Sequence, residues 1–75
     1  MGRYIEVLTQ ELAESVARLR CVQDTMDSIY NDIDESAFLK KVTSKKEVAD
    51  ISTTVASAMA SMNRILKDIE REAKA

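Results

Sequence analysis

Apolar residues recur along the first half of the chain in alternating steps of three and four. The series is Ile5, Leu8, Leu12, Ser15, Leu19, Val22, Met26, Ile29 and Ile33, in which Ser15 is the one polar member. Heptad spacing of this kind places its members along one stripe of an α-helix and is typical of helices that pack as coiled coils. The pattern predicts a first long helix over about residues 3–34.

A second series with the same steps occupies the other half of the chain. It comprises Val48, Ile51, Val55, Ala58, Met62, Ile65 and Ile69, and ends at the polar Glu72. Just before it, the run Ser44-Lys45-Lys46-Glu47 has the form of a capping box. In that motif the serine oxygen accepts from the glutamate amide, while the glutamate side chain reaches back to the serine amide. We therefore expect a second helix over about residues 45–73, beginning at Lys45.

Residues 35–44 should connect the two helices. Asp34 and Glu35 place negative charge where the first helix ends, which is unfavourable at a helix C-terminus, and the heptad register is lost after them. Each helix would be about 45 Å long at about 1.5 Å per residue. Equal helices with a short connector favour one all-α domain over residues 1–75, an antiparallel helical hairpin with a coiled-coil-like seam. The alternative is one uninterrupted helix of about 70 residues, against which the register break and the capping box argue.

The connector contains three apolar residues, Phe38, Leu39 and Val42. They could fold over the end of the hairpin as a hydrophobic plug, or they could form a short extra helical turn. We favour the plug, because Phe38 is the largest apolar side chain of the sequence and its exposure to water would be unfavourable.

Apolar and small residues beside the two series predict a surface for a partner. Val16 and Tyr30 flank the first series, Met59 and Leu66 flank the second, and the stretch 51–63 carries no charge. An uncharged stretch of helix suggests contact on more than one side, and a stripe this wide exceeds what one neighbouring helix covers. The alternative is a solvated face rich in serine and threonine. The predicted partner-binding residues are Val16, Tyr30, Thr53, Ala56, Met59, Ala60 and Leu66.

The length of 75 residues also points to association. A lone core of this size rarely supplies more than about 3–5 kcal/mol unless disulfides, a metal or oligomerisation contribute. We therefore expect a strongly helical chain that is not a stable monomer. The hairpin should join a helical bundle, either as a homo-oligomer or on a different helical protein.

The composition argues against catalysis and against bound groups. The chain has no histidine, only one cysteine and only one glycine, so it lacks the usual proton shuttle and the glycine-rich phosphate loops. Cys21 alone can form neither an internal disulfide nor a tetrahedral zinc site, and the acidic run 27–35 lacks the turn glycine of a calcium loop. We expect no enzyme activity, cofactor, metal or small-molecule substrate. Without a signal-peptide pattern or a membrane-length apolar stretch, the expected location is cytoplasmic.

Charge is distributed unevenly between the halves. Residues 1–37 contain eight acidic and three basic residues, a net charge of −5, whereas residues 38–75 contain eight basic and five acidic residues, a net charge of +3. The flanks of the two helices should therefore attract each other. Four lysines, Lys40, Lys41, Lys45 and Lys46, gather at the connector. They could bind nucleic acid or an anionic membrane, but no aromatic residues alternate with them, and a solvated turn is the simpler interpretation.

In size, acidity and hairpin form the sequence resembles, in a general way, the small co-chaperones of bacterial secretion apparatus. It equally resembles the short coiled-coil subunits of eukaryotic tethering or kinetochore complexes, and no motif separates these groups. We expect a non-enzymatic protein–protein interaction module, a small assembly subunit or partner chaperone, for example in a secretion apparatus. The alternative is a nucleic-acid or anionic-membrane surface binder that uses the lysine cluster.

Overall fold

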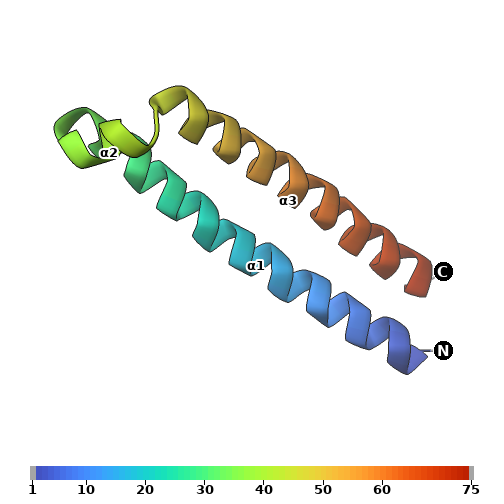
Figure 1. The fold of residues 1–75 in the computed structure, drawn as a ribbon. Helices are drawn as coiled ribbons and strands as arrows, with labels where there is room; N and C mark the ends of the chain where they lie inside the picture. The colour runs from blue at the N-terminus through green and yellow to red at the C-terminus, as the bar shows by residue number, and fades with distance from the viewer. Residues whose placement is uncertain (1, 75) are drawn as a thin grey trace.

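The computed structural model describes residues 2–74 as a helical hairpin (Figure 1). Its elements are the helix α1 (Gly2–Asp32), the 3-10 turn η1 (Ile33–Glu35), the short helix α2 (Ala37–Val42) and the helix α3 (Lys45–Lys74). The two long helices pack side by side and antiparallel, while η1 and α2 connect them at one end. The structure confirms the predicted all-α hairpin and excludes the single uninterrupted helix.

The helices meet along a seam that differs from the predicted one at every second position. The seam comprises Thr9, Leu12, Val16, Leu19, Gln23, Met26 and Ile33 from α1 and η1, and Val48, Ser52, Val55, Met59, Met62, Leu66 and Ile69 from α3, all buried or half-buried. The correctly predicted seam residues are Leu12, Leu19, Met26, Ile33, Val48, Val55, Met62 and Ile69. Ser15 was predicted where Val16 lies, and Ala58 where Met59 lies.

The physical reason for this shift is the filling of the central layers. The predicted and the observed heptad registers share half of their seam positions. At the other half, the observed seam residue lies one position along the chain from the predicted one. The observed register buries Val16 and Met59, which are 6% and 9% exposed, and leaves Ser15 and Ala58 outside the seam. At these central layers a valine and a long, adaptable methionine bury more apolar area than a serine and an alanine. On either side of them the same register buries Gln23 and Ser52 in place of the predicted Val22 and Ile51.

The predicted helix start at Lys45 is confirmed. The amide of Glu47 donates to the Ser44 hydroxyl oxygen at 3.2 Å, which is one half of the capping box. The other half is different, because the Glu47 carboxylate accepts from the Thr43 hydroxyl at 2.6 Å. At the start of α2, the Ser36 hydroxyl oxygen likewise accepts from the Leu39 amide at 3.2 Å.

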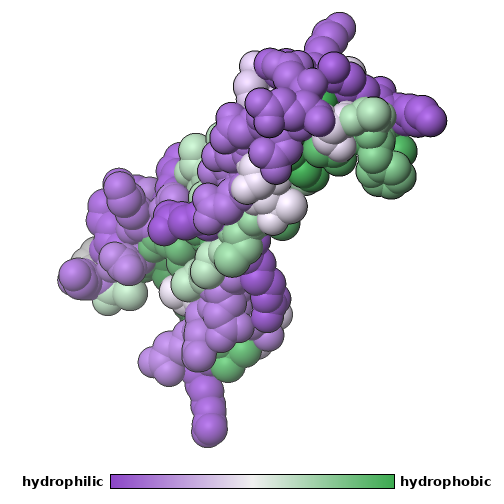
Figure 2. Space-filling model, turned by 90° about the vertical axis from the view of Figure 1, so that its left-hand side faces the viewer, coloured by the Kyte–Doolittle hydropathy of each residue, from purple (hydrophilic) through white to green (hydrophobic). Residues whose placement is uncertain are grey.

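The predicted hydrophobic plug is wrong, and the alternative of an extra helical turn is right. Phe38 and Val42 lie four residues apart on α2 and are 72% and 58% exposed, whereas Leu39 is half-buried. Ile33, only 2% exposed, fills the end of the hairpin instead. Figure 2, which views the connector end, shows apolar surface among hydrophilic groups at the top of the molecule.

Within residues 2–74, none of the helices is both long and apolar enough to cross a membrane.

Candidate interaction surfaces

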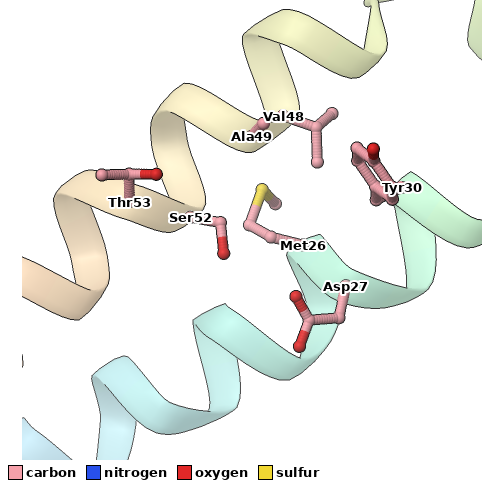
Figure 3. Close-up of a pocket in the computed structure, with 7 residues that line it drawn as sticks. All are labelled: Met26, Asp27, Tyr30, Val48, Ala49, Ser52 and Thr53. Carbon is pink, nitrogen blue, oxygen red and sulfur yellow. The ribbon is translucent and has the colours of Figure 1, made fainter.

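A groove of about 270 Å³ lies between the long helices near the connector (Figure 3). Its lining residues are Met26, Asp27 and Tyr30 from α1 and Val48, Ala49, Ser52 and Thr53 from α3. The side chains of Met26 and Tyr30 point toward α3, while the carboxylate of Asp27 is turned away from it (Figure 3). The groove is therefore lined by apolar side chains of both helices together with the polar side chains of Asp27, Ser52 and Thr53.

At the connector end of the hairpin, Lys45 of α3 contacts Asp34 of η1 and Tyr30 of α1. Its Nζ lies 2.6 Å from a carboxylate oxygen of Asp34 and 5.1 Å from the ring centroid of Tyr30. The hydrogen bond to Lys45 lowers the pKa of Asp34, and the same bond raises the pKa of Lys45. One of the four lysines of the cluster is therefore engaged within the chain.

The predicted attraction between the flanks of α1 and α3 produces no ion pair between these two helices in the described residues. The Arg18–Glu14 pair, at 3.9 Å, lies within α1. Asp68 binds Arg64 at 3.1 Å and Arg71 at 2.9 Å, both within α3. Across the described part of the chain, no ion pair joins α1 directly to α3.

A second, wider groove of about 620 Å³ lies at the other end of the hairpin, opposite the connector. Its apolar lining includes Ile5 and Ala13 of α1 and Ile69 and Ala73 of α3. Glu6 and Glu70 also line it. Two carboxylates therefore border this groove.

These two grooves define which residues share a side of the hairpin. Asp27 and Ala49 border one groove, and each directly follows a seam residue of its helix. Ala13 and Glu70 of the other groove also directly follow seam residues. Residues that directly precede seam positions on the two helices therefore lie together on the opposite side.

That opposite side, which we name the Ile51 face, is apolar. It consists of Leu8, Ser15, Val22 and Ile29 from α1 and Ile51, Ala58 and Ile65 from α3, and the exposed Glu72 ends the α3 stripe with a carboxylate. Ile51 and Ile65 are 41% and 39% exposed, and Ile29 is half-buried. The side with the grooves, which we name the Ala56 face, carries Ala13, Arg20, Asp27, Ala49, Ala56, Asn63 and Glu70.

The predicted partner-binding residues are divided between the seam and the Ala56 face. Val16, Met59 and Leu66 were expected to flank the seam, and this placement is wrong, because all three pack within it. Tyr30 is 41% exposed and lies at the margin of the seam, beside Lys45.

Three of the predicted residues remain on the surface. The Ala56 face of α3 exposes Thr53, Ala56 and Ala60. The sequence prediction missed Ile51 and Ile65 as surface residues, because it had placed them in the seam. Their exposure could have been inferred only from the correct choice between the two heptad interpretations.

The chemistry-bearing residues form no further site in the described residues. Cys21 is exposed on α1. From Gly2 to Lys74, no group of three or more histidine, cysteine, aspartate or glutamate side chains is placed to hold a metal ion. The exposed apolar face is therefore the strongest candidate for function.

The chain matches no protein-family model, no curated protein and no solved structure.

Proposed function

We propose that the protein is a non-enzymatic interaction module, a small assembly subunit or partner chaperone that packs an apolar helix face on further helices. The Ile51 face carries this proposal. It places exposed isoleucine, leucine and valine side chains from both long helices on one side of the hairpin. Contiguous apolar surface of this kind marks sites of protein–protein interaction.

The uncharged segment of α3 supports the proposal. Between Ile51 and Asn63 the inward stripe, Ser52, Val55, Met59 and Met62, packs toward α1. The remaining uncharged side chains, such as Ile51 and Ala56, lie exposed on both sides of that stripe. A helix that only had to bind α1 could carry charge on those sides.

The exposed area of the whole chain supports it as well. A compact monomer of 8.4 kDa exposes about 4,600 Å². This chain exposes 5872 Å², about 1,300 Å² more. Docking on other helices would cover surface that the hairpin alone leaves in water.

The test compares single lysine substitutions on the two sides of α3. Ile65→Lys would place a charge on the Ile51 face, and Ser57→Lys would place the same charge on the back of α3, where Ser57 is exposed. Sedimentation measures self-association, and pull-down from a lysate of the source organism measures binding to other proteins. We expect Ile65→Lys to abolish either self-association or binding to other proteins, and Ser57→Lys to change neither. Equal behaviour of both variants and the native chain would contradict the proposal.

Ala56→Lys, on the Ala56 face, tests the predicted surface that remains exposed. If Thr53, Ala56 and Ala60 also contact a partner, this variant should weaken assembly while the helical content measured by circular dichroism is unchanged. Assembly that tolerates Ala56→Lys but not Ile65→Lys would assign the contact to the Ile51 face alone.

A second candidate function is binding to an anionic membrane surface through the connector. The observation that favours it is the exposure of Phe38 and Val42 on the same short helix as Lys40 and Lys41. Apolar side chains beside lysines are typical of segments that lie at a lipid interface. Cosedimentation with phosphatidylcholine vesicles, with and without phosphatidylserine, tests it. Binding that requires phosphatidylserine and is lost in Phe38→Ala would support this function, and equal recovery with both vesicles would contradict it.

A further inference from the structure

We infer that the partner of the Ile51 face is a basic amphipathic helix of another protein. Its apolar stripe packs on the face, while lysine or arginine side chains near both ends of the stripe meet carboxylates of the hairpin. The inference rests on the proposed function and names the chemistry of the partner.

The two edges of the Ile51 face are mainly acidic. They are formed by the residues four positions before, or three positions after, the residues of the face, which lie beside them on the side away from the seam. The edge residues are Tyr4, Glu11, Arg18, Thr25 and Asp32 on α1, and Glu47, Thr54, Ser61 and Asp68 on α3. All are exposed except the half-buried Asp68. Together with Glu72, the edges therefore carry five carboxylates and one guanidinium.

The basic residues near these carboxylates leave the face negative. Asp68 is paired with Arg64 at 3.1 Å and with Arg71 at 2.9 Å, but both arginines lie at the back of α3, on the same stripe as Ser57. Arg18, the one base of the edges, is itself paired within α1. The other four carboxylates take part in none of the ion pairs of residues 2–74: Glu11, Asp32, Glu47 and Glu72.

The carboxylates lie toward the two ends of the face. The groove residues near the connector fix the register of the long helices, which places Asp32 level with Glu47, and Glu11 level with Asp68. These two levels are 21 residues apart on each helix, which is about 31 Å at a rise of 1.5 Å per residue. Glu72 adds a further carboxylate beyond Asp68. A helix that meets both levels needs basic residues near both ends of a stripe about three heptads long.

The hydroxyl groups in the middle of the face are already satisfied. Ser15, Thr25 and Thr54 each donate to the carbonyl oxygen four residues earlier in their own helix, at 2.8, 3.1 and 2.9 Å. The apolar surface beside them comes from Val22, Ile29, Ile51, Ala58 and Ile65. An apolar stripe can therefore cover the middle of the face without leaving these donors buried and unpaired.

The charge of the edges selects among the possible occupants of the face. Two Ile51 faces packed together would bring carboxylates against carboxylates, and an anionic membrane would be repelled in the same way. Basic side chains would instead be attracted, which speeds encounter and fixes the register of the contact. An amphipathic helix is a common means of covering an apolar surface on a helical protein. A basic amphipathic helix combines both properties.

The first experiment measures binding of a synthetic basic helix by fluorescence anisotropy. The probe, called the lysine peptide, has four heptads with leucine at both seam positions, lysine beside them in the first and last heptads, and alanine and glutamine elsewhere. Lysine on both flanks keeps the peptide from pairing with itself. A matched glutamate peptide carries glutamate in place of every lysine. We expect the native chain to bind the lysine peptide more tightly by about tenfold or more. Equal affinities for the two peptides would overturn the inference.

The second experiment locates the contact with two double variants of equal net charge. Glu11→Lys with Glu72→Lys reverses two carboxylates of the Ile51 face, and Glu6→Lys with Glu70→Lys reverses two carboxylates on the opposite side. All four glutamates are exposed and lie in the half of the hairpin away from the connector. We expect the first pair to weaken binding of the lysine peptide by about tenfold or more, and the second pair by about twofold at most. Equal losses would show attraction to the acidic chain as a whole and would overturn the inference.

Sedimentation and pull-down separate failure of the inference from failure of the proposed function. Dimers of the native chain that Ile65→Lys dissociates, but the lysine peptide does not, would assign the face to a second copy. Proteins that are lost in Ile65→Lys but retained by the Glu11→Lys, Glu72→Lys variant would assign it to a partner that is not basic. Either result overturns the inference and leaves the proposed function in place. If Ile65→Lys and Ser57→Lys match the native chain in peptide binding, sedimentation and pull-down, the inference and the proposed function both fail.

Discussion

At the scale of single residues, side-chain hydroxyls fix where the helices begin. The Ser44 oxygen satisfies the Glu47 amide, one of the donors that the first turn of α3 would otherwise leave unpaired. Ser36 does the same for Leu39 in α2. These caps, together with the Asp34–Lys45 ion pair, hold the turn in place without a glycine or a proline.

Replacing Ser44 by alanine should therefore destabilise the hairpin by about 1 kcal/mol, because the Glu47 amide loses its partner. Urea unfolding followed by circular dichroism measures this free energy. Ser57→Ala, within α3, is the control and should be neutral or slightly stabilising, since alanine is the better helix former. A neutral effect at both serines would show that the cap does not contribute.

The Asp34–Lys45 pair should make stability depend on pH at both extremes. The pKa of Asp34 is lowered from 3.8, so its contribution is complete above that value and is lost as the pH falls through the lowered pKa. The pKa of Lys45 is raised from 10.5, so its contribution is complete below that value and is lost as the pH rises through the raised pKa. An NMR titration of the Asp34 carboxyl carbon should show the lowered pKa in the native chain and a normal one in Lys45→Gln. Identical titrations would refute the role of the pair.

At the scale of the elements, the sequence predicts the two helices because breakers are nearly absent and the apolar spacing is regular. The start of α3 at Lys45 follows from the local chemistry of Ser44 and Glu47. The choice between Ser15 and Val16, or between Ala58 and Met59, depends on both helices at once. Local periodicity cannot decide it, since an apolar series on one helix is compatible with either register. For the same reason the Ile51 face was not predicted.

The observed register predicts different costs for the same substitution at two valines of α1. Val16→Ala should destabilise the hairpin by about 2 kcal/mol, because Val16 is buried among Val55 and Met59. Val7→Ala should change the stability by less than about 0.5 kcal/mol, because Val7 is exposed. Chemical unfolding of both variants at a concentration where the chain is monomeric measures the difference. Similar costs at both sites would argue against the register.

At the scale of the whole molecule, the hairpin is long and thin. Its Cα radius of gyration is 16.8 Å, whereas a compact domain of this length has about 11 Å. An elongated shape keeps every layer of the seam only two helices deep, so few side chains become fully buried. A partner helix alongside the hairpin would deepen these layers without lengthening the molecule.

This geometry predicts how small-angle X-ray scattering should change when the lysine peptide binds. A helix packed about 10 Å away alongside the hairpin adds mass but changes the radius of gyration from 16.8 Å by no more than about 1 Å. Binding in line with one end would instead raise it above about 25 Å, because the hairpin is 54 Å long and the peptide about 42 Å. We expect the native chain with the peptide to exceed the summed forward scattering of its components at a nearly constant radius, and no such excess with Ile65→Lys at the same concentrations. A radius that rises steeply would mean that the peptide binds an end of the hairpin, with the Ile51 face left in water.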